Sequence, residues 1–139
     1  MTADPNSVEN KAGKLVLVDD EPLLLRAFTR LLRRSYPDTS VINSANMRIA
    51  EVIEAIREQL GPNLTLIMDG QYIGGEAKNI IDALSADLAH HAVRVIVMTG
   101  DSQAAINVSR AFPQVPALAK PVDIQVLLET IRTAVPFKL

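Results

Sequence analysis

The stretch KLVLVDDEP, residues 14–22, places four apolar residues directly before three carboxylates, those of Asp19, Asp20 and Glu21. A short, continuous apolar run of this kind is typical of a strand that is buried on both faces of a parallel sheet. Pro22 suits the first turn of a helix, because its missing N–H needs no partner there. The stretch therefore predicts a buried strand that ends in acidic residues and leads directly into a helix.

The rest of the chain repeats this alternation of strand and helix. Each further apolar run is followed by a segment in which apolar residues recur at helical spacing. Strands that alternate with helices imply right-handed crossovers and a parallel sheet. We therefore predict an α/β fold, a three-layer sandwich whose five-stranded parallel sheet carries helices on both faces. The expected strands are residues 15–18, 41–42, 64–68, 93–98 and 115–119, and the expected helices are residues 24–31, 49–60, 77–88, 102–112 and 123–135.

Length and composition indicate one ordinary globular domain. The chain has 139 residues, of which 48% are hydrophobic and 22% charged, close to the average of soluble domains. We expect a flexible, polar tail at residues 1–13 and one domain at residues 14–139. The lack of cysteine excludes disulfides and thiolate metal sites. The net charge of −2 gives no general reason to bind nucleic acid or a membrane, and no apolar run has the length of a membrane span or a signal peptide core, so we expect a cytoplasmic protein.

Polar side chains follow the expected strands at the point where each strand ends. The first strand ends at Asp19 and Asp20, the third at Asp69, the fourth at Thr99 and the fifth at Lys120. Parallel strands place their carboxyl ends along one edge of the sheet, and open α/β sheets bind their ligands there. The sequence therefore predicts that three acids, a hydroxyl and an amine converge at this edge.

These residue types suit phosphoryl chemistry. Clustered carboxylates repel one another and attract a cation, and oxygen ligands without histidine or cysteine suit Mg²⁺, which we expect as the cofactor. An aspartate is ionised at neutral pH and can act as the nucleophile toward a phosphoryl group, a role for which Asp69 is the candidate. Lys120 would offset charge on the phosphoryl oxygens, and Thr99 would donate a hydrogen bond to one of them.

The order of these pieces resembles the receiver domains of two-component response regulators. The matching motifs are LVLVDDEP, LTLIMDG, VIVMTG and ALAKP, and the resemblance extends from Lys14 to the C-terminus. It implies a flavodoxin-like sheet in the strand order 2-1-3-4-5, an order for which a member of this family is a known example. It also implies Mg²⁺ held by Asp19, Asp20, Asp69 and the main-chain carbonyl of Gln71, and phosphorylation of Asp69.

The same resemblance implies the partners. A receiver domain is a signalling module rather than an enzyme, and it accepts its phosphoryl group from a sensor histidine kinase or a histidine phosphotransfer protein. It then acts on a downstream protein partner or an output domain, without binding nucleic acid or a membrane directly. It is also compatible with a homodimer that forms on phosphorylation. Arg26, Arg30, Arg33 and Arg34 share a face of the first helix, near which such donors dock, although a solvated face is the ordinary explanation of such arginines.

The chain departs from the receiver pattern in three places. The loop after Asp69 reads DGQYIGGEAKN and lacks the usual proline, and Ala117 stands where many receivers carry an aromatic switch residue. The stretch between the acidic pair and Asp69 is also a few residues longer than usual, which we assign to a long second helix or its flanks. Without the aromatic residue, we expect the loop of residues 99–102 and the following helix to carry the conformational switch.

Two other functions compete with a phosphorylated receiver. An aspartate-nucleophile phosphohydrolase would share the nucleophile and the metal, but its Asp-x-Asp signature fails here because Asp69 is followed by Gly70 and Gln71. A degenerate receiver would keep the fold as a protein-binding module and would not be phosphorylated. The unusual loop and Ala117 are compatible with this second alternative.

Overall fold

The computed structural model describes residues 13–139, so the expected tail lies almost entirely outside the described residues. The elements alternate as predicted, with one addition, a hairpin of two short strands after β3. In chain order they are β1 (Lys14–Asp19), α2 (Pro22–Leu32), β2 (Thr39–Asn43), α3 (Ile49–Arg57), β3 (Leu64–Asp69), β4 (Gln71–Tyr72), β5 (Gly75–Glu76), α4 (Ala77–His90), β6 (Arg94–Thr99), α5 (Ser102–Ala111), β7 (Ala117–Ala119) and α6 (Ile124–Thr133).

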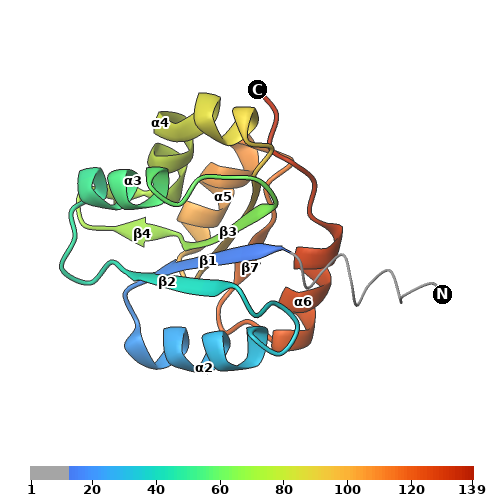
Figure 1. Ribbon diagram of the computed structural model, residues 1–139. Helices are drawn as coiled ribbons and strands as arrows, with labels where there is room; N and C mark the ends of the chain where they lie inside the picture. Colours follow the sequence, from blue (N-terminus) through green and yellow to red (C-terminus); the bar gives the residue numbers. More distant parts are fainter. Residues whose placement is uncertain (1–12) are drawn as a thin grey trace.

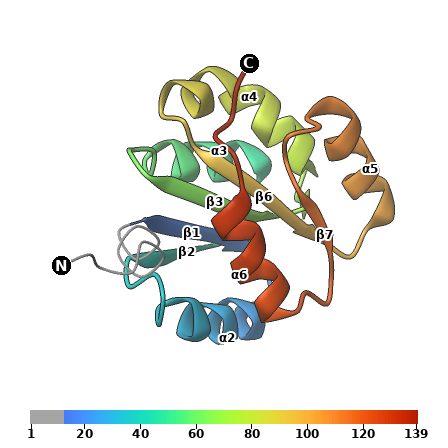
Figure 2. The same ribbon diagram turned by 90° about the vertical axis from the view of Figure 1, so that its right-hand side faces the viewer.

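A single five-stranded sheet forms the middle layer of the molecule (Figure 1). All its neighbouring strands run parallel, in the order β2-β1-β3-β6-β7. Helices α2 and α6 cover one face, and α3, α4 and α5 cover the other, as the turned view in Figure 2 makes clear. The predicted three-layer α/β fold and its strand order are therefore confirmed.

Two apolar clusters, one on each face of the sheet, hold the layers together. Alternate residues of β1 separate between them, because successive side chains of a strand point to opposite faces: Val16 and Val18 join the cluster under α3, α4 and α5, whereas Leu15 and Leu17 join the one under α2 and α6. Since both faces are covered, the strands are apolar throughout. Truncating a fully buried leucine or isoleucine in such a core to alanine removes about 2–5 kcal/mol of stability.

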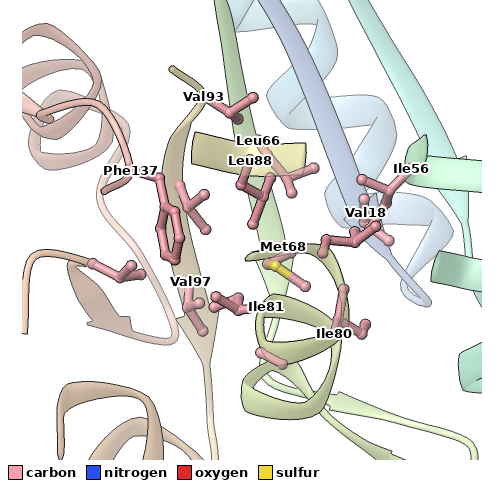
Figure 3. Close-up of a cluster of buried hydrophobic side chains, with 14 of the residues drawn as sticks. Val18, Ile56, Leu66, Met68, Ile80, Ile81, Leu88, Val93, Val97 and Phe137 are labelled. Atoms are coloured by element: carbon pink, nitrogen blue, oxygen red, sulfur yellow. The ribbon is translucent and has the colours of Figure 1, made fainter. Parts of the chain in front are cut away.

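The C-terminal segment adds to the larger cluster. Beyond α6 the chain runs antiparallel to the start of β6, where Pro136 forms an isolated β-bridge with Arg94. In the same place the Phe137 N–H donates to the Val93 carbonyl at 2.8 Å. The Phe137 ring is 3% exposed and lies 5.8 Å from that of Phe112, centroid to centroid. Figure 3 shows this ring among the buried side chains of β3, β6 and α4.

The second helix is shorter than predicted. We expected a helix over residues 49–60, with the extra length of this stretch in the helix or its flanks, but α3 ends at Arg57. Residues 58–60 instead form a tighter turn, in which Gln59 N donates to the Ile56 carbonyl at 2.9 Å and Leu60 N to the Arg57 carbonyl at 3.3 Å. The Gly61–Pro62 pair then prevents the helix from continuing, because a proline restricts the residue before it to extended conformations. Leu60 nevertheless packs against the core, which explains its helical spacing.

Two smaller features concern the start of a helix and membrane spans. The Asp123 side chain caps α6, since it accepts hydrogen bonds from Gln125 N and Val126 N. Within residues 13–139, every helix is too short or too polar to cross a membrane.

Candidate functional site

The ends of four neighbouring strands bring the predicted site residues to one edge of the sheet. Asp19 ends β1, Asp69 ends β3 and Thr99 ends β6, and Lys120 directly follows β7. Asp19, Asp69 and Thr99 are buried, with 1%, 8% and 3% of their surface exposed. Burial of two carboxylates is unfavourable unless cations or hydrogen bonds compensate them. The position of Lys120 supplies that compensation.

The Lys120 ammonium joins the carboxylates. Its Nζ lies 2.8 Å from Asp19 Oδ2, 3.4 Å from Asp69 Oδ1 and 3.2 Å from Glu21 Oε1. The contacts to Asp19 and Asp69 unite residues that are 101 and 51 positions apart in the chain. The contact to Glu21 was not predicted, because nothing in its surroundings in the chain indicates a lysine 99 positions away.

Main-chain N–H groups fix the orientation of the two buried carboxylates. Asp19 Oδ1 accepts from the N–H of Asp20 at 2.8 Å and of Glu21 at 3.1 Å. Asp69 Oδ1 accepts from the N–H of Gly70 at 2.7 Å. Gly70 is required at this position, since an added Cβ would lie 2.4 Å from Thr99 Oγ1. The Asp69 carboxylate is thus held by one of its oxygens, close to Thr99.

Hydrogen bonds connect Thr99 to the loop that follows it. Through Asp101 they also connect it to the segment after Asp69. Thr99 Oγ1 accepts from Asp101 N at 3.0 Å, so its own proton is free to be donated elsewhere. The Asp101 side chain caps α5 by accepting from Ala104 N at 2.8 Å, and its other oxygen accepts from Gln71 Nε2 at 2.9 Å. Gln71, expected as a metal ligand through its main-chain carbonyl, lies in β4 next to this edge. The role of that carbonyl stays a prediction.

The electrostatics of the edge leave Asp69 difficult to ionise. Burial, together with the negative charge of Asp19, raises the pKa of Asp69 to about 6, although Lys120 and the Gly70 N–H act in the opposite direction. The pKa of Asp20 is also raised, by burial and by the nearby Asp19. Burial would lower the pKa of Lys120, but its hydrogen bond to Asp19 and the charges of Asp69 and Asp19 raise it overall. The acidic side chains at this edge therefore outnumber Lys120, the cation that contacts them.

The donor set fits a small divalent cation. Asp19, Asp20 and Glu21 each offer a carboxylate oxygen, and these oxygens lie within 4.8 Å of one another. Mg²⁺ binds through one or two carboxylates and retains several waters, so a group with one buried and two exposed carboxylates suits it. A second positive charge would also offset the repulsion that raises the Asp20 and Asp69 pKa values. The predicted ligand Asp69 does not belong to this group of three. Lys120 contacts Asp69 as well as Asp19 and Glu21 of the group.

Measuring stability as a function of pH should show that ionised Asp69 destabilises the folded protein. An acid with a folded pKa above its unfolded value binds more protons when folded, so the free energy of unfolding should fall as pH rises from 3.8 to about 6. In metal-free protein we expect Asp69→Asn to remove this step and to be more stable than the parent at pH 7, by an amount on the order of 2–3 kcal/mol. Urea unfolding between pH 4 and pH 7 measures the difference.

Asp82→Asn is the matched control for this titration. Asp82 lies exposed on α4, where it pairs with Lys78 at 3.1 Å. Its replacement should leave the pH profile parallel to that of the parent. If the pH profile of Asp69→Asn is also parallel to that of the parent, then folding does not raise the pKa of Asp69.

The fold, compared with known proteins, falls among receiver domains. No family model matches the sequence, and no curated protein matches it either. Among solved structures, the beryllofluoride-activated NtrC4 receiver domain dimer has a TM-score of 0.65 at 22% identity, over 88% of this chain and 95% of that one. The receiver domain of the hybrid histidine kinase CckA has a TM-score of 0.63 at 23% identity, over 88% and 98%. The chain has the fold of a receiver domain.

The receiver fold alone does not carry an activity. A de novo designed Rossmann-fold protein also matches, with a TM-score of 0.59 at 14% identity over 91% of this chain and 95% of that one. Function must therefore be argued from the residues at the edge of the sheet. In this receiver fold the position of Ala117 is confirmed in β7, three residues before Lys120.

The expected arginine face of the first helix differs in part from the prediction. Helix α2 ends at Leu32, so Arg33 is its C-cap, and the guanidinium of Arg33 donates two hydrogen bonds to the Thr39 carbonyl, at 3.1 and 2.8 Å. Arg26, Arg30 and Arg33 line a groove of about 600 Å³ between α2 and β2, and Arg34 is not part of it. Three of the four arginines thus border one concave surface.

Proposed function

We propose that this chain is the phosphoacceptor receiver domain of a two-component phosphorelay and that Asp69 carries the phosphoryl group. The observation that supports this most is the buried Asp69 carboxylate, held at the end of the central strand by Lys120 and Gly70 beside a buried Asp19. A structural ion pair would not need a second buried acid competing for the same lysine. A site that receives an additional anion and its counter-cation explains both acids and the lysine.

The reaction follows from the atoms at the edge. Asp69 Oδ1 is engaged by Gly70 N and Lys120 Nζ, which leaves Oδ2 as the nucleophile. A bond forms between Oδ2 and phosphorus while the bond between phosphorus and a donor imidazole nitrogen breaks, and the leaving imidazole keeps the electron pair. Lys120 would offset the charge on the phosphoryl oxygens, and the free proton of Thr99 would be donated to one of them.

A bound Mg²⁺ would neutralise charge on the transferred group during this step. Asp19, Asp20 and Asp69 would hold it, together with the main-chain carbonyl of Gln71. The repulsion that raises the pKa of Asp20 and of Asp69 supports this assignment.

We further propose the partners that such a reaction requires. The donor is a sensor histidine kinase or a histidine phosphotransfer protein, and the signal passes to a downstream protein or an output domain in the cytoplasm. The NtrC4 receiver domain is a dimer in its beryllofluoride-activated form, which makes a phosphorylation-dependent homodimer a reasonable form for the output. The arginine-lined groove beside α2 gives an incoming acidic surface a complementary face.

Incubation with a small-molecule phosphodonor and Mg²⁺ tests the proposal. Intact mass should report one added phosphoryl group per chain, and peptide mapping should place it on Asp69. A protein that acquires no phosphoryl group under these conditions supports instead the degenerate receiver that acts as a binding module. Ala117 and the hairpin in place of the usual loop are the features that favour that second candidate.

Asp20→Asn should weaken Mg²⁺ binding by about tenfold or more, because it removes both a ligand and a charge from the donor set. Glu21→Gln is the matched control, since Glu21 belongs to the same group of three but also contacts Lys120 at 3.2 Å. We expect the Glu21 variant to bind Mg²⁺ within a fewfold of the parent. Calorimetric titration with MgCl₂ measures both. A larger loss for Glu21→Gln than for Asp20→Asn would move the ion toward Glu21.

A further inference from the structure

The five-stranded sheet has a free edge at β2. Within the part of the chain that the structure describes, β2 pairs with β1 and has no strand on its other side (Figure 1). The outer strand of a sheet presents unpaired main-chain N–H and C=O groups, to which another extended segment can bind. The residues along this edge decide which segment it accepts.

Hydrogen bonds at the two ends of β2 show which residues face the free edge. At its start, Leu15 N donates to the Asp38 carbonyl at 2.9 Å, and at its end Ser44 N donates to the carbonyl of the last residue of β1, also at 2.9 Å. In a parallel pair only alternate residues of a strand bond to the neighbour, so the even-numbered residues bond to β1 and the odd-numbered ones face outward. Val41, in the middle of β2, therefore offers both its N–H and its C=O to the free edge.

A side chain of α2's end confirms this alternation. The Arg33 guanidinium donates two hydrogen bonds to the Thr39 carbonyl, which must therefore point away from β1. Arg33 thus occupies the free edge at the first residue of β2. The edge remains open from Val41 onward.

A basic groove runs along the open part of this edge. It has a volume of about 600 Å³ and is lined by residues of α2 and β2, without any residue of α6. Its apolar lining includes Leu25 and Val41, of which Val41 is 45% exposed. Its lining has no acidic residue, and within residues 13–139 no ion pair involves its cations, which are Arg26, Arg30 and Arg33. The groove therefore suits a segment that is acidic and partly apolar.

The spacing of the arginines matches that of side chains on an extended strand. Arg26 and Arg30 lie four residues apart on α2, which corresponds to a rise of about 6 Å along the helix axis. Alternate residues of a strand share one face and lie about 6.6 Å apart. A strand added beside Val41 would therefore place successive side chains of one face next to successive arginines. Acidic residues at alternate positions of that strand would pair with them.

A second copy of this chain fits the groove poorly. Pairing of two β2 edges would bring the arginines of both copies to one interface, and like charges opposite one another across a sheet are destabilising. The occupant that the charges favour is therefore a different protein, one that contributes carboxylates.

We propose that the groove between α2 and β2 binds an extended acidic segment of a partner protein, which adds to the free edge of β2 as a further strand. The main-chain groups of Val41 bond to this segment, and Arg26 and Arg30 bind carboxylates at its alternate positions. The proposed function leaves the form of the acidic partner open, and this inference supplies it. It does not require Asp69 to carry a phosphoryl group.

Fluorescence anisotropy with a labelled peptide of repeated glutamate–threonine pairs tests the charge part of this inference, on unphosphorylated protein without Mg²⁺. The parent should bind the peptide, and Arg30→Gln should weaken binding about three- to fivefold, the value of one exposed ion pair. Arg34→Gln is the matched control, because it removes the same charge close by but outside the groove, and it should leave the affinity unchanged. Equal losses in the two variants, or a parent that does not bind the peptide, would overturn the inference.

Val41→Pro tests the added strand. It removes the outward N–H and keeps the bonds to β1, since an edge strand tolerates proline where the N–H faces solvent. Val41→Thr is the matched control, because it keeps both the N–H and the branched shape. We expect Val41→Pro to bind the peptide about threefold or more weakly than Val41→Thr, the value of one main-chain hydrogen bond. Equal affinities of the two folded variants would overturn the inference.

Amide hydrogen exchange of the parent decides the matter if Val41→Pro does not fold. The peptide should slow exchange of the Val41 amide, and unchanged exchange there would contradict the added strand. Self-association of the parent that Arg30→Gln strengthens would assign the edge to a second copy and would overturn the inference as well. Failure of Asp69 to accept a phosphoryl group refutes the proposed function but leaves the peptide result standing, so the two failures are distinguishable.

Discussion

Asp69→Asn is expected to abolish phosphorylation by a small-molecule phosphodonor while the fold persists. The amide has nearly the shape of the carboxylate but is a poor nucleophile, and its oxygen can still accept from Gly70 N, as Asp69 Oδ1 does at 2.7 Å. Intact mass after incubation with phosphodonor and Mg²⁺ measures the loss. Far-ultraviolet circular dichroism should remain that of the parent.

A second aspartate provides the control for this experiment. Asp101 lies at the same edge, where it caps α5 and accepts a hydrogen bond from Gln71, so Asp101→Asn should retain labelling at Asp69. A phosphoryl group found on another residue of Asp69→Asn would move the acceptor and refute the assignment.

Lys120→Ala should lower both stability and phosphorylation. The lysine side chain is 13% exposed, and its removal would leave the buried carboxylates of Asp19 and Asp69 without their cation. Breaking a buried ion pair in this way typically reduces the free energy of unfolding by about 3–5 kcal/mol. We expect a loss of this order at pH 7 and a smaller loss near pH 4, where Asp69 is protonated in the folded state. Urea unfolding at the two pH values measures the change.

Lys78→Ala is the control that shows how much stability is lost when an exposed lysine is removed. Lys78 forms an exposed pair with Asp82 at 3.1 Å, one helical turn along α4, and exposed pairs contribute about 0–1 kcal/mol. A loss for Lys120→Ala no greater than for Lys78→Ala would contradict the stabilising role of Lys120. Addition of Mg²⁺ should restore part of the stability of Lys120→Ala, since a bound cation would replace the missing charge.

The sequence was sufficient to predict the layers of the fold and the convergence of the site residues. Uninterrupted apolar runs such as residues 64–68 and 93–98 specify strands covered on both faces, and parallel strands must end at a common edge. Asp19, Asp69, Thr99 and Lys120 could therefore be placed together before their distances were known. The strand order itself came from the resemblance to receiver domains, because periodicity does not determine which strands are neighbours.

The features that were missed depend on contacts between distant or very short segments. The β4–β5 hairpin has strands of two residues, too short for any periodic pattern, and Gly74, with φ of 94°, supplies its turn. Gly74 and Gly75 were the only local signal for it. The burial of Phe137 and the contact of Glu21 with Lys120 are tertiary, and no local pattern specifies them.

The close approach of Gly70 to Thr99 links the evolution of two positions that are 29 residues apart in the chain. A Cβ at position 70 would lie 2.4 Å from Thr99 Oγ1 and 2.5 Å from Thr99 Cβ, so a lineage cannot replace this glycine unless residue 99 moves or changes with it. Substitutions at the two positions should therefore co-occur among homologues. A homologue that has lost the glycine will also have displaced or lost the hydroxyl at 99, so this one small residue distinguishes lineages that retain the acceptor geometry from lineages that have abandoned it.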